Sequence, residues 1–235
     1  MSEPDRRSGR RTGRTHNAEG AREAILNAAE QVFAQHGFDG ARVDAIAQAA
    51  GYNKSLIFQY FGDKLGLYAE VIRRADDQTR VLQTEVLAAL SAGDMTRPET
   101  LARLLREFVG WYFDYLVAHP QILRIYNWEM AEGWQTFSKI ISQRDYDDIE
   151  QFGAVLTKLQ TAGLLRTKLD PIVQMVAGVF VSHGLLGILP VFRYMMPSVD
   201  LSTPDGLAAL REFIVELVTN GLLRVPEPAG TPATT

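Results

Sequence analysis

Residues 43–61 carry the pattern that most restricts the fold of this chain, because two short apolar-periodic segments meet there at a glycine. The first segment has apolar residues at offsets 0, 3, 4 and 7: Val43, Ile46, Ala47 and Ala50. This spacing is typical of one face of an α-helix. Gly51 follows directly, and glycine adopts the left-handed conformation that ends many helices without steric cost. The segment therefore predicts a helix that ends in a tight turn.

A second short helix is predicted from Asn53 to Phe61. Asn53 can cap it, since its side chain can accept a hydrogen bond from a free backbone N–H of the first turn. The apolar side chains expected to hold this helix on the core are Leu56, Tyr60 and Phe61, with help from Ile57. Lys54, Ser55 and Gln59 then lie on other faces, where they could enter a DNA groove. The two helices together predict a helix-turn-helix and a DNA-binding protein.

The charge of the chain favours a local nucleic-acid surface over a general one. The 235 residues have a formal net charge of −4, while residues 1–64 hold nine Lys and Arg against eight Asp and Glu. Any basic surface for DNA must therefore be confined to a small area. The chain has no cysteine, which excludes disulfides, cysteine-based zinc sites and a thiol nucleophile. With 46% hydrophobic residues and no apolar leader, we expect a soluble, cytoplasmic protein.

Both ends of the sequence are polar and without apolar period, so we expect residues 1–16 and 225–235 to be disordered. The first segment contains five arginines: Arg6, Arg7, Arg10, Arg11 and Arg14. A flexible arginine arm ahead of a helix-turn-helix can enter a narrow minor groove. The alternative is a solvated tail that aids solubility.

Helical periodicity extends over the rest of the chain, and no alternating pattern predicts a sheet, so the fold class is all-α. We expect a DNA-binding domain over 17–63 and a larger helical domain over 64–224. The predicted helices cover 17–36, 43–50, 53–61, 63 to about 90, 98–118, 120–132, 137–162, 171–189 and 204–223. Several begin with proline, whose missing N–H is not needed in a first turn.

Residues 171–192 contain no charged side chain and are long enough to span a membrane. They also contain Gln174, Ser182, His183 and two prolines, and no second apolar segment of this length accompanies them. We therefore expect no membrane partner and a helix that is buried on nearly all sides.

At this point the sequence resembles the amino-terminal domain of the tetracycline-repressor (TetR) family of transcriptional regulators. The resemblance covers about 50 residues and rests on three pieces at their mutual spacing: I-L-N-A-A-E-Q-V-F-A-Q-H-G-F at 25–38, V-D-A-I-A-Q-A-A-G at 43–51 and L-I-F-Q-Y-F-G-D-K at 56–64. It implies a homodimer on a palindromic operator in double-stranded DNA, with a carboxy-terminal domain that dimerises and binds a small-molecule effector. No cofactor or metal is implied.

The resemblance also implies roles for single residues. It places Asn53, Lys54, Ser55 and Gln59 in the recognition helix, and Tyr60 and Lys64 at phosphates. Two positions depart from the family pattern. Phe58 replaces a common tyrosine, which removes a hydroxyl for a phosphate, and Arg42 replaces a common threonine, so a guanidinium can make that phosphate contact instead.

Lys54 is the first candidate for base readout, because lysine donates to guanine O6 and N7 and lies just inside the helix start. Gln59 could read adenine, although an exposed amide needs no such role. Tyr60 lies near the apolar face of its helix, so packing is favoured over a phosphate contact as its role, although its hydroxyl could serve both.

Residues 108–137 form a dense aromatic segment that could line a pocket for an apolar or aromatic ligand. The candidate lining residues are Phe108, Trp111, Tyr115, Tyr126, Trp128, Met130, Trp134 and Phe137. The alternative for each is a place in an ordinary helical core.

The last two helices are apolar on more than one face, which predicts an intersubunit four-helix bundle. Candidate interface residues are Val176, Phe180, His183, Gly184, Leu210, Phe213, Ile214 and Leu217. Gly178, Gly184 and Gly187 would permit close helix approach.

Enzyme interpretations have little support. The four histidines lack metal-ligand spacing, and no phosphate-binding glycine loop or nucleophile elbow is present. An acidic cluster (Asp145, Asp147, Asp148, Glu150) is better read as a solvated face than as a metal site. The leading prediction is a ligand-released repressor. An activator, a ligand-independent DNA binder, and a helical carrier or enzyme without DNA binding stay open as alternatives.

Overall fold

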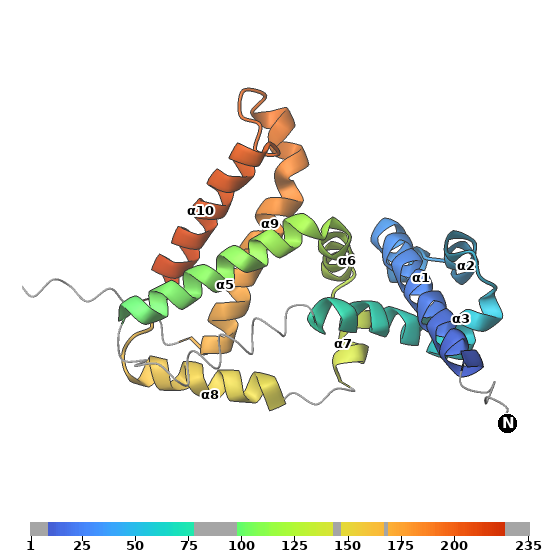
Figure 1. Cartoon of the computed structure of the whole chain (residues 1–235). Helices are drawn as coiled ribbons and strands as arrows, with labels where there is room; N and C mark the ends of the chain where they lie inside the picture. The colour runs from blue at the N-terminus through green and yellow to red at the C-terminus, as the bar shows by residue number, and fades with distance from the viewer. Residues whose placement is uncertain (1–8, 78–97, 143–146, 167–168, 224–235) are drawn as a thin grey trace, which may run out of the picture. The chain divides into compact units, whose positions relative to one another are not determined.

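The computed structural model describes residues 9–77, 98–142, 147–166 and 169–223, and within these ranges the chain is all-α (Figure 1). The fold class predicted from the helical periodicity is confirmed. The helices are α1 (Gly9–Gly40), α2 (Val43–Ala50), α3 (Lys54–Phe61), an unlabelled helix over 64–77, α5 (Pro98–Ala118), α6 (Pro120–Ala131), α7 (Gln135–Ile141), α8 (Asp147–Thr161), α9 (Pro171–Met195) and α10 (Pro204–Leu222). The described part has no strand, but an isolated bridge joins Leu165 to Leu223.

Several helix boundaries differ from those expected. Helix α1 begins at Gly9 and not at Asn17, because no proline interrupts the hydrogen-bonded backbone upstream. The expected helix over 137–162 ends already at Ile141, where the polar run from Ser142 supplies no apolar face, and α8 begins at Asp147. Helix α9 continues through Pro190 to Met195, six residues beyond the predicted end.

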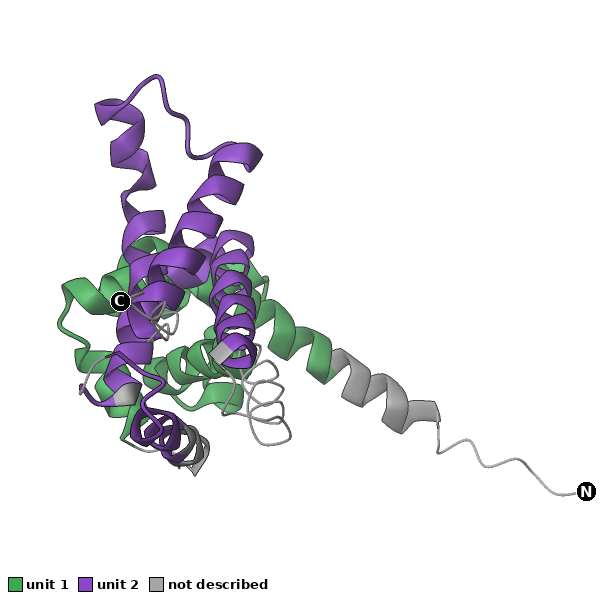
Figure 2. Ribbon diagram, turned by 90° about the vertical axis from the view of Figure 1, so that its left-hand side faces the viewer, with its two compact units in different colours: residues 1–77, 124–143 green, residues 78–123, 144–235 purple. Residues whose placement is uncertain are grey.

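The chain forms two compact units (Figure 2). Unit 1 contains residues 1–77 and 124–143, and unit 2 contains residues 78–123 and 144–235. Unit 1 thus includes the 64–77 helix together with most of α6 and all of α7, beyond the predicted limit at residue 63. The physical reason is visible at Tyr68, which is 1% exposed and donates a hydrogen bond of 2.7 Å to Glu129 of α6.

The core of unit 1 is aromatic and aliphatic. The Phe33 ring meets the Tyr68 ring edge-on at 4.8 Å between centroids, and Phe38 lies 5.1 Å from Tyr68. Helix α1 is interrupted at Gly37, whose φ of 67° is left-handed. A Cβ atom there would lie 3.1 Å from the Trp128 ring, so glycine is required by both conformation and space.

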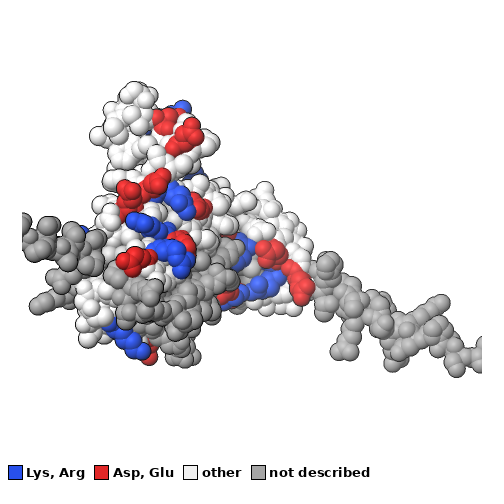
Figure 3. Space-filling view, turned by 60° about the vertical axis from the view of Figure 1, so that its left-hand side comes forward, with Lys and Arg blue, Asp and Glu red and all other residues white. Residues whose placement is uncertain are grey.

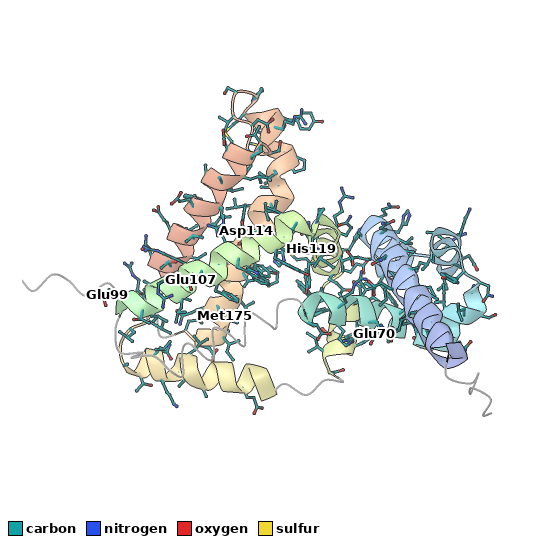
Figure 4. All side chains as sticks on the ribbon, in the orientation of Figure 1. Glu70, Glu99, Glu107, Asp114, His119 and Met175 are labelled. Atoms are coloured by element: carbon teal, nitrogen blue, oxygen red, sulfur yellow. The ribbon has the colours of Figure 1, made fainter. Side chains whose placement is uncertain are left out.

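Unit 2 is built on α5, which packs against α9 and α10, while α8 packs on α9. The Gly178 backbone lies against α10, since a Cβ atom there would be 2.8 Å from a Val218 methyl group. Arg211 of α10 pairs with both carboxylate oxygens of Asp114 of α5 at 2.9 Å. Asp114 is labelled in Figure 4. Close helix approach at Gly178 therefore occurs within one chain.

Helix α9 is less buried than we expected. Its segment Ile172–Met195 is long and apolar enough to cross a membrane, yet only 17% of its most apolar window is buried inside the described chain. The prediction that it is buried on nearly all sides is wrong for a single chain. One face packs on α5, α8 and α10, and the other is left uncovered, with Val173, Val176, Ile188 and Val191 exposed.

Candidate nucleic-acid interface

The turn between α2 and α3 has the geometry that its sequence predicts. Gly51 is left-handed, with φ 74° and ψ 20°, and its N–H donates to the carbonyl oxygens of Ala47 and Gln48. The Asn53 side chain then accepts a hydrogen bond of 2.8 Å from the Leu56 N–H and caps α3. Both helix ends are thus closed by local hydrogen bonds, which sets the direction of α3 relative to α2.

The buried face of this pair is centred on isoleucines. Ile46 of α2 and Ile57 of α3 are fully buried, and Ala47 and Phe61 are also buried. Leu56 and Tyr60, expected on the buried face, are only half-buried, so Ile57 and not Leu56 anchors the helix. Because the anchor is Ile57, the opposite face of α3 is turned outward with Ser55, Phe58 and Gln59 exposed.

Lys54 has a partner that sequence reasoning missed. Its Nζ lies 3.1 Å from one carboxylate oxygen of Asp44 and 3.2 Å from the other, and both side chains are exposed. Asp44 lies in the first turn of α2, where an acidic side chain complements the helix dipole. Its place there was readable from the sequence, but its distance from Lys54 depends on the turn geometry.

The candidate backbone contacts are also placed by local structure. Arg42 is the exposed residue before α2 and makes no side-chain cap, so its guanidinium is not used by the helix end. The Lys64 Nζ donates 3.2 Å to the Asp39 carbonyl oxygen and lies 4.6 Å from the centre of the Phe38 ring. Burial raises the pKa of the nearby Glu132 carboxyl group, and the negative charge of Asp39 raises it further. The positive charge of Lys64 offsets part of this rise. Even without DNA, the Lys64 ammonium group therefore lies close to protein groups that accept its hydrogen bond or attract its charge.

The arginine arm falls largely outside the described structure. Arg6 and Arg7 precede residue 9, and the side chains of Arg10, Arg11 and Arg14 are not among those described, although their backbone belongs to α1. The tail over 225–235 also lies outside the described residues.

The eight aromatic-segment candidates do not form one cavity. Phe108, Trp111 and Tyr115 belong to unit 2, and the other five belong to unit 1. In unit 1, the Tyr126, Trp134 and Phe137 rings pack together, and Met130 is exposed. The Trp128 Nε1 donates 3.3 Å to the Ala34 carbonyl oxygen, and its side chain is partly exposed. Phe108 lines a cavity in unit 2.

The interface candidates separate into two groups. Val176, Gly184, Phe213 and Leu217 are exposed, and Phe180 is half-buried. In contrast, His183, Leu210 and Ile214 are buried inside their own chain, where Ile214 has no exposed surface. The exposed group lies on the outer faces of α9 and α10, at helical spacing.

Lysine and arginine are mixed with acidic residues on the face of the molecule that Figure 3 shows. In the face shown in Figure 3, Lys and Arg alternate with Asp and Glu and form no continuous basic area. Residues 1–64, which include α2 and α3, carry a nearly even balance of nine Lys and Arg against eight Asp and Glu. Any DNA contact must then depend on a few placed cations.

Comparison with known proteins assigns the family. The model described as bacterial regulatory proteins, tetR family, matches residues 25–71, and the tetracyclin repressor-like C-terminal domain model matches residues 102–218. The chain belongs to the TetR family. The first match contains the whole α2–turn–α3 segment, and the second extends the assignment to the helical region that the resemblance in sequence did not cover.

TetR-family relatives agree with this assignment. The transcriptional repressor NicS of Pseudomonas putida is 36% identical over 117 residues, which are 49% of this chain and 51% of that protein. The regulator RutR of Escherichia coli is 34% identical over 125 residues, 52% of this chain and 54% of RutR. The chain spans about half the length of the curated relatives it matches. These relatives are transcriptional regulators by name.

Solved structures extend the likeness to the whole fold. The Streptomyces coelicolor regulator SCO4942 has a TM-score of 0.55 and 26% identity over 88% of this chain and 99% of that one. A TetR-family regulator from Marinobacter aquaeolei has a TM-score of 0.62 at 20% identity, over 90% of this chain and all of that one, which shows the fold alone.

Proposed function

We propose that this TetR-family chain is a sequence-specific DNA-binding repressor that acts as a homodimer on a palindromic operator in the cytoplasm. A small, mainly apolar ligand releases it from the operator. The observation that carries the proposal is the outward face of α3, where polar side chains are held over a fully buried Ile46–Ile57 contact region. A rigid short helix with exposed donors is the element that enters a major groove in helix-turn-helix proteins.

Within that face, the proposed base-reading residues are Asn53, Lys54, Ser55 and Gln59. Asn53 uses its side-chain oxygen as the cap, which leaves the amide nitrogen as its group for DNA. The proposed backbone contacts are Arg42, Tyr60 and Lys64. Arg42 supports this role by its position at the α2 start, where helix N–H groups also favour a phosphate.

The uncovered apolar face of α9 and α10 supports the dimer. Val173, Val176, Phe213 and Leu217 are exposed large hydrophobic residues on two helices. Several exposed apolar side chains on two helices that pack together favour an interaction site. A second copy would cover it by the same face, which gives a four-helix bundle with two-fold symmetry.

The test of DNA recognition is selection of duplexes from a random pool, followed by titration of the selected duplex by fluorescence anisotropy. We expect a palindromic site, and we expect Lys54→Ala to weaken binding by about 1–3 kcal/mol while relaxing preference at one base pair. Lys139→Ala, an exposed lysine of α7, is the matched control. If Lys54→Ala weakens all duplexes equally, Lys54 is a phosphate contact only. Failure to select any sequence at low salt would refute DNA binding.

Sedimentation velocity tests the dimer. Leu217→Glu places a charge on the proposed interface and should shift the chain to monomer at micromolar concentration, whereas Leu169→Glu, at an equally exposed leucine outside α9 and α10, should not. A wild-type monomer would refute the homodimer.

A further inference from the structure

Unit 2 contains a narrow cavity between α5, α9 and α10. Phe108 and Tyr112 of α5 form one wall, Met175 and Ser182 of α9 form another, and Val218 closes it from α10. The cavity volume of about 10 Å³ is room for about one water molecule. None of the described residues that line it is charged. Its lining makes it a site for apolar atoms, provided that the walls can move apart.

The Ser182 hydroxyl is the feature that points to a ligand. Ser182 is 1% exposed and lies on the cavity wall, and its Oγ has no hydrogen-bond partner within the described part of the chain. A buried hydroxyl without a partner costs stability relative to a methyl group in the same place. Retaining such a group in an apolar wall is understandable if another molecule supplies the missing hydrogen bond.

A second polar group, the Tyr112 hydroxyl, belongs to the α5 wall of the cavity. The Tyr112 hydroxyl is 3.0 Å from the His183 Nε2, and the two rings meet edge-on at 5.6 Å. His183 is buried, and burial lowers the pKa of its imidazole to about 4, so it is neutral at pH 7. The Tyr112–His183 pair therefore contributes polar groups to the site but no charge. An ionised ligand would find no counter-charge among the described residues that line the cavity.

The walls of the cavity include side chains that can make room. Met175 is unbranched and has three rotatable bonds, so it can change conformation at small cost. It lies on the α9 wall, labelled in Figure 4. Opposite, Phe108 supplies an aromatic surface for a flat molecule.

We infer that this cavity opens to bind an uncharged, mainly apolar molecule with one hydroxyl or carbonyl group, which hydrogen-bonds to the Ser182 Oγ. The regulatory role of such a ligand rests on the proposed function, but its binding does not. A molecule of one aromatic ring is the smallest occupant that would use both the Phe108 surface and the hydroxyl.

Three probes with a common tolyl group separate the chemistry: p-cresol has a hydroxyl, toluene has none, and 4-methylbenzoate has a charge. Titration of the full chain without DNA is followed through the methyl carbon-13 signals of its six methionines, with the Met175 signal assigned by Met175→Leu. We expect p-cresol to shift Met175 at the lowest concentration, toluene at a higher one, and 4-methylbenzoate at the highest.

Ser182→Ala is the decisive variant. It should raise the Kd of p-cresol about three- to tenfold, the worth of one neutral hydrogen bond, and leave the Kd of toluene unchanged. The free variant should unfold at the same or a higher urea concentration than wild type. Ser182→Cys, with a weaker hydrogen-bonding group, should act in the same direction if the alanine variant fails to fold. Ser202→Ala, at an exposed serine of the same unit, should change neither Kd.

The inference is overturned if no probe shifts Met175, if 4-methylbenzoate binds most tightly, or if Ser182→Ala changes p-cresol and toluene equally. Binding that depends on Ser182 in a chain that selects no DNA would support the site and refute only the proposed function.

Discussion

The Lys54–Asp44 ion pair predicts that a substitution of Asp44 strengthens DNA binding, whereas the loss of a residue that contacts DNA would weaken it. If Lys54 moves to a base or phosphate, its pairing with Asp44 is lost, and the Asp44 carboxylate is left near the phosphates. Both effects oppose binding. Asp44→Asn removes the negative charge at nearly constant shape and should therefore strengthen binding to the operator.

The size of the effect follows from the geometry. At the observed 3.1 Å, two unit charges in water attract by about 1.3 kcal/mol. Exposure, salt and side-chain entropy reduce the worth of such a pair to about 0.2–1 kcal/mol. Repulsion between the carboxylate and the phosphates adds a screened term of similar order. The sum predicts a Kd about three- to tenfold lower for Asp44→Asn.

The assay is anisotropy with the selected operator and a shuffled duplex, at two salt concentrations. Both duplexes should gain affinity, and the gain should shrink as salt rises. In a Lys54→Ala background no pair is lost on binding, so the gain from Asp44→Asn should be smaller. Glu216→Gln, which removes one exposed negative charge from α10, is the control for net charge.

Unchanged or weaker operator binding by Asp44→Asn would refute this reasoning. Weaker binding limited to the operator would mean that Asp44 holds Lys54 in its reading position, so that the pair persists on DNA.

Three further predictions concern other parts of the chain. Deleting residues 1–14 should lower the salt dependence of DNA binding, because up to five arginine–phosphate contacts disappear; an unchanged slope would make the arm irrelevant to binding. Tyr68→Phe should lower the free energy of unfolding by about 1–3 kcal/mol in urea titrations, since the buried Glu129 loses the donor at 2.7 Å; additive effects of Tyr68→Phe and Glu129→Gln would argue against coupling. The pKa of His183 is about 4 in the folded chain, below its ordinary 6.5, so the unfolded chain binds more protons between these values. Stability should therefore fall from pH 7 to pH 5 by about 2 kcal/mol more in wild type than in His183→Leu, and equal slopes would contradict the burial argument.

The sequence was sufficient for the features that depend on short-range chemistry. Gly51 and Asn53 act as predicted, because a left-handed helix end and a side-chain cap are properties of a few consecutive residues. The starts of α5, α6, α9 and α10 at prolines were predicted correctly for the same reason. The family followed from three adjacent pieces that all belong to this local part of the fold.

The sequence was insufficient where a role depends on a distant partner. The spacing of α3 suggested Leu56 as the anchor, but Ile57 is the fully buried side chain, because the direction of α3 is set by the turn. The aromatic segment looked like one pocket, yet its members divide between two units, since α6 begins in one and continues in the other. Ser182 stood out only as a polar residue in an uncharged segment, and nothing in the sequence placed it at a cavity.

Helix α9, whose burial was predicted wrongly, takes part in both the proposed dimer surface and the proposed ligand site. Its uninterrupted apolar sequence suggested burial on all sides, but the structure divides it into an inner face with Ser182 and an outer face with Val176 and Gly184. The inner face lines the cavity, and the outer face is the proposed dimer surface. A ligand that separates α9 from α5 would necessarily displace the outer face as well, because an α-helix moves as a rigid element. In the proposed homodimer that outer face packs on the second copy, so binding at Ser182 would favour one dimer arrangement over another if the two differ in cavity size.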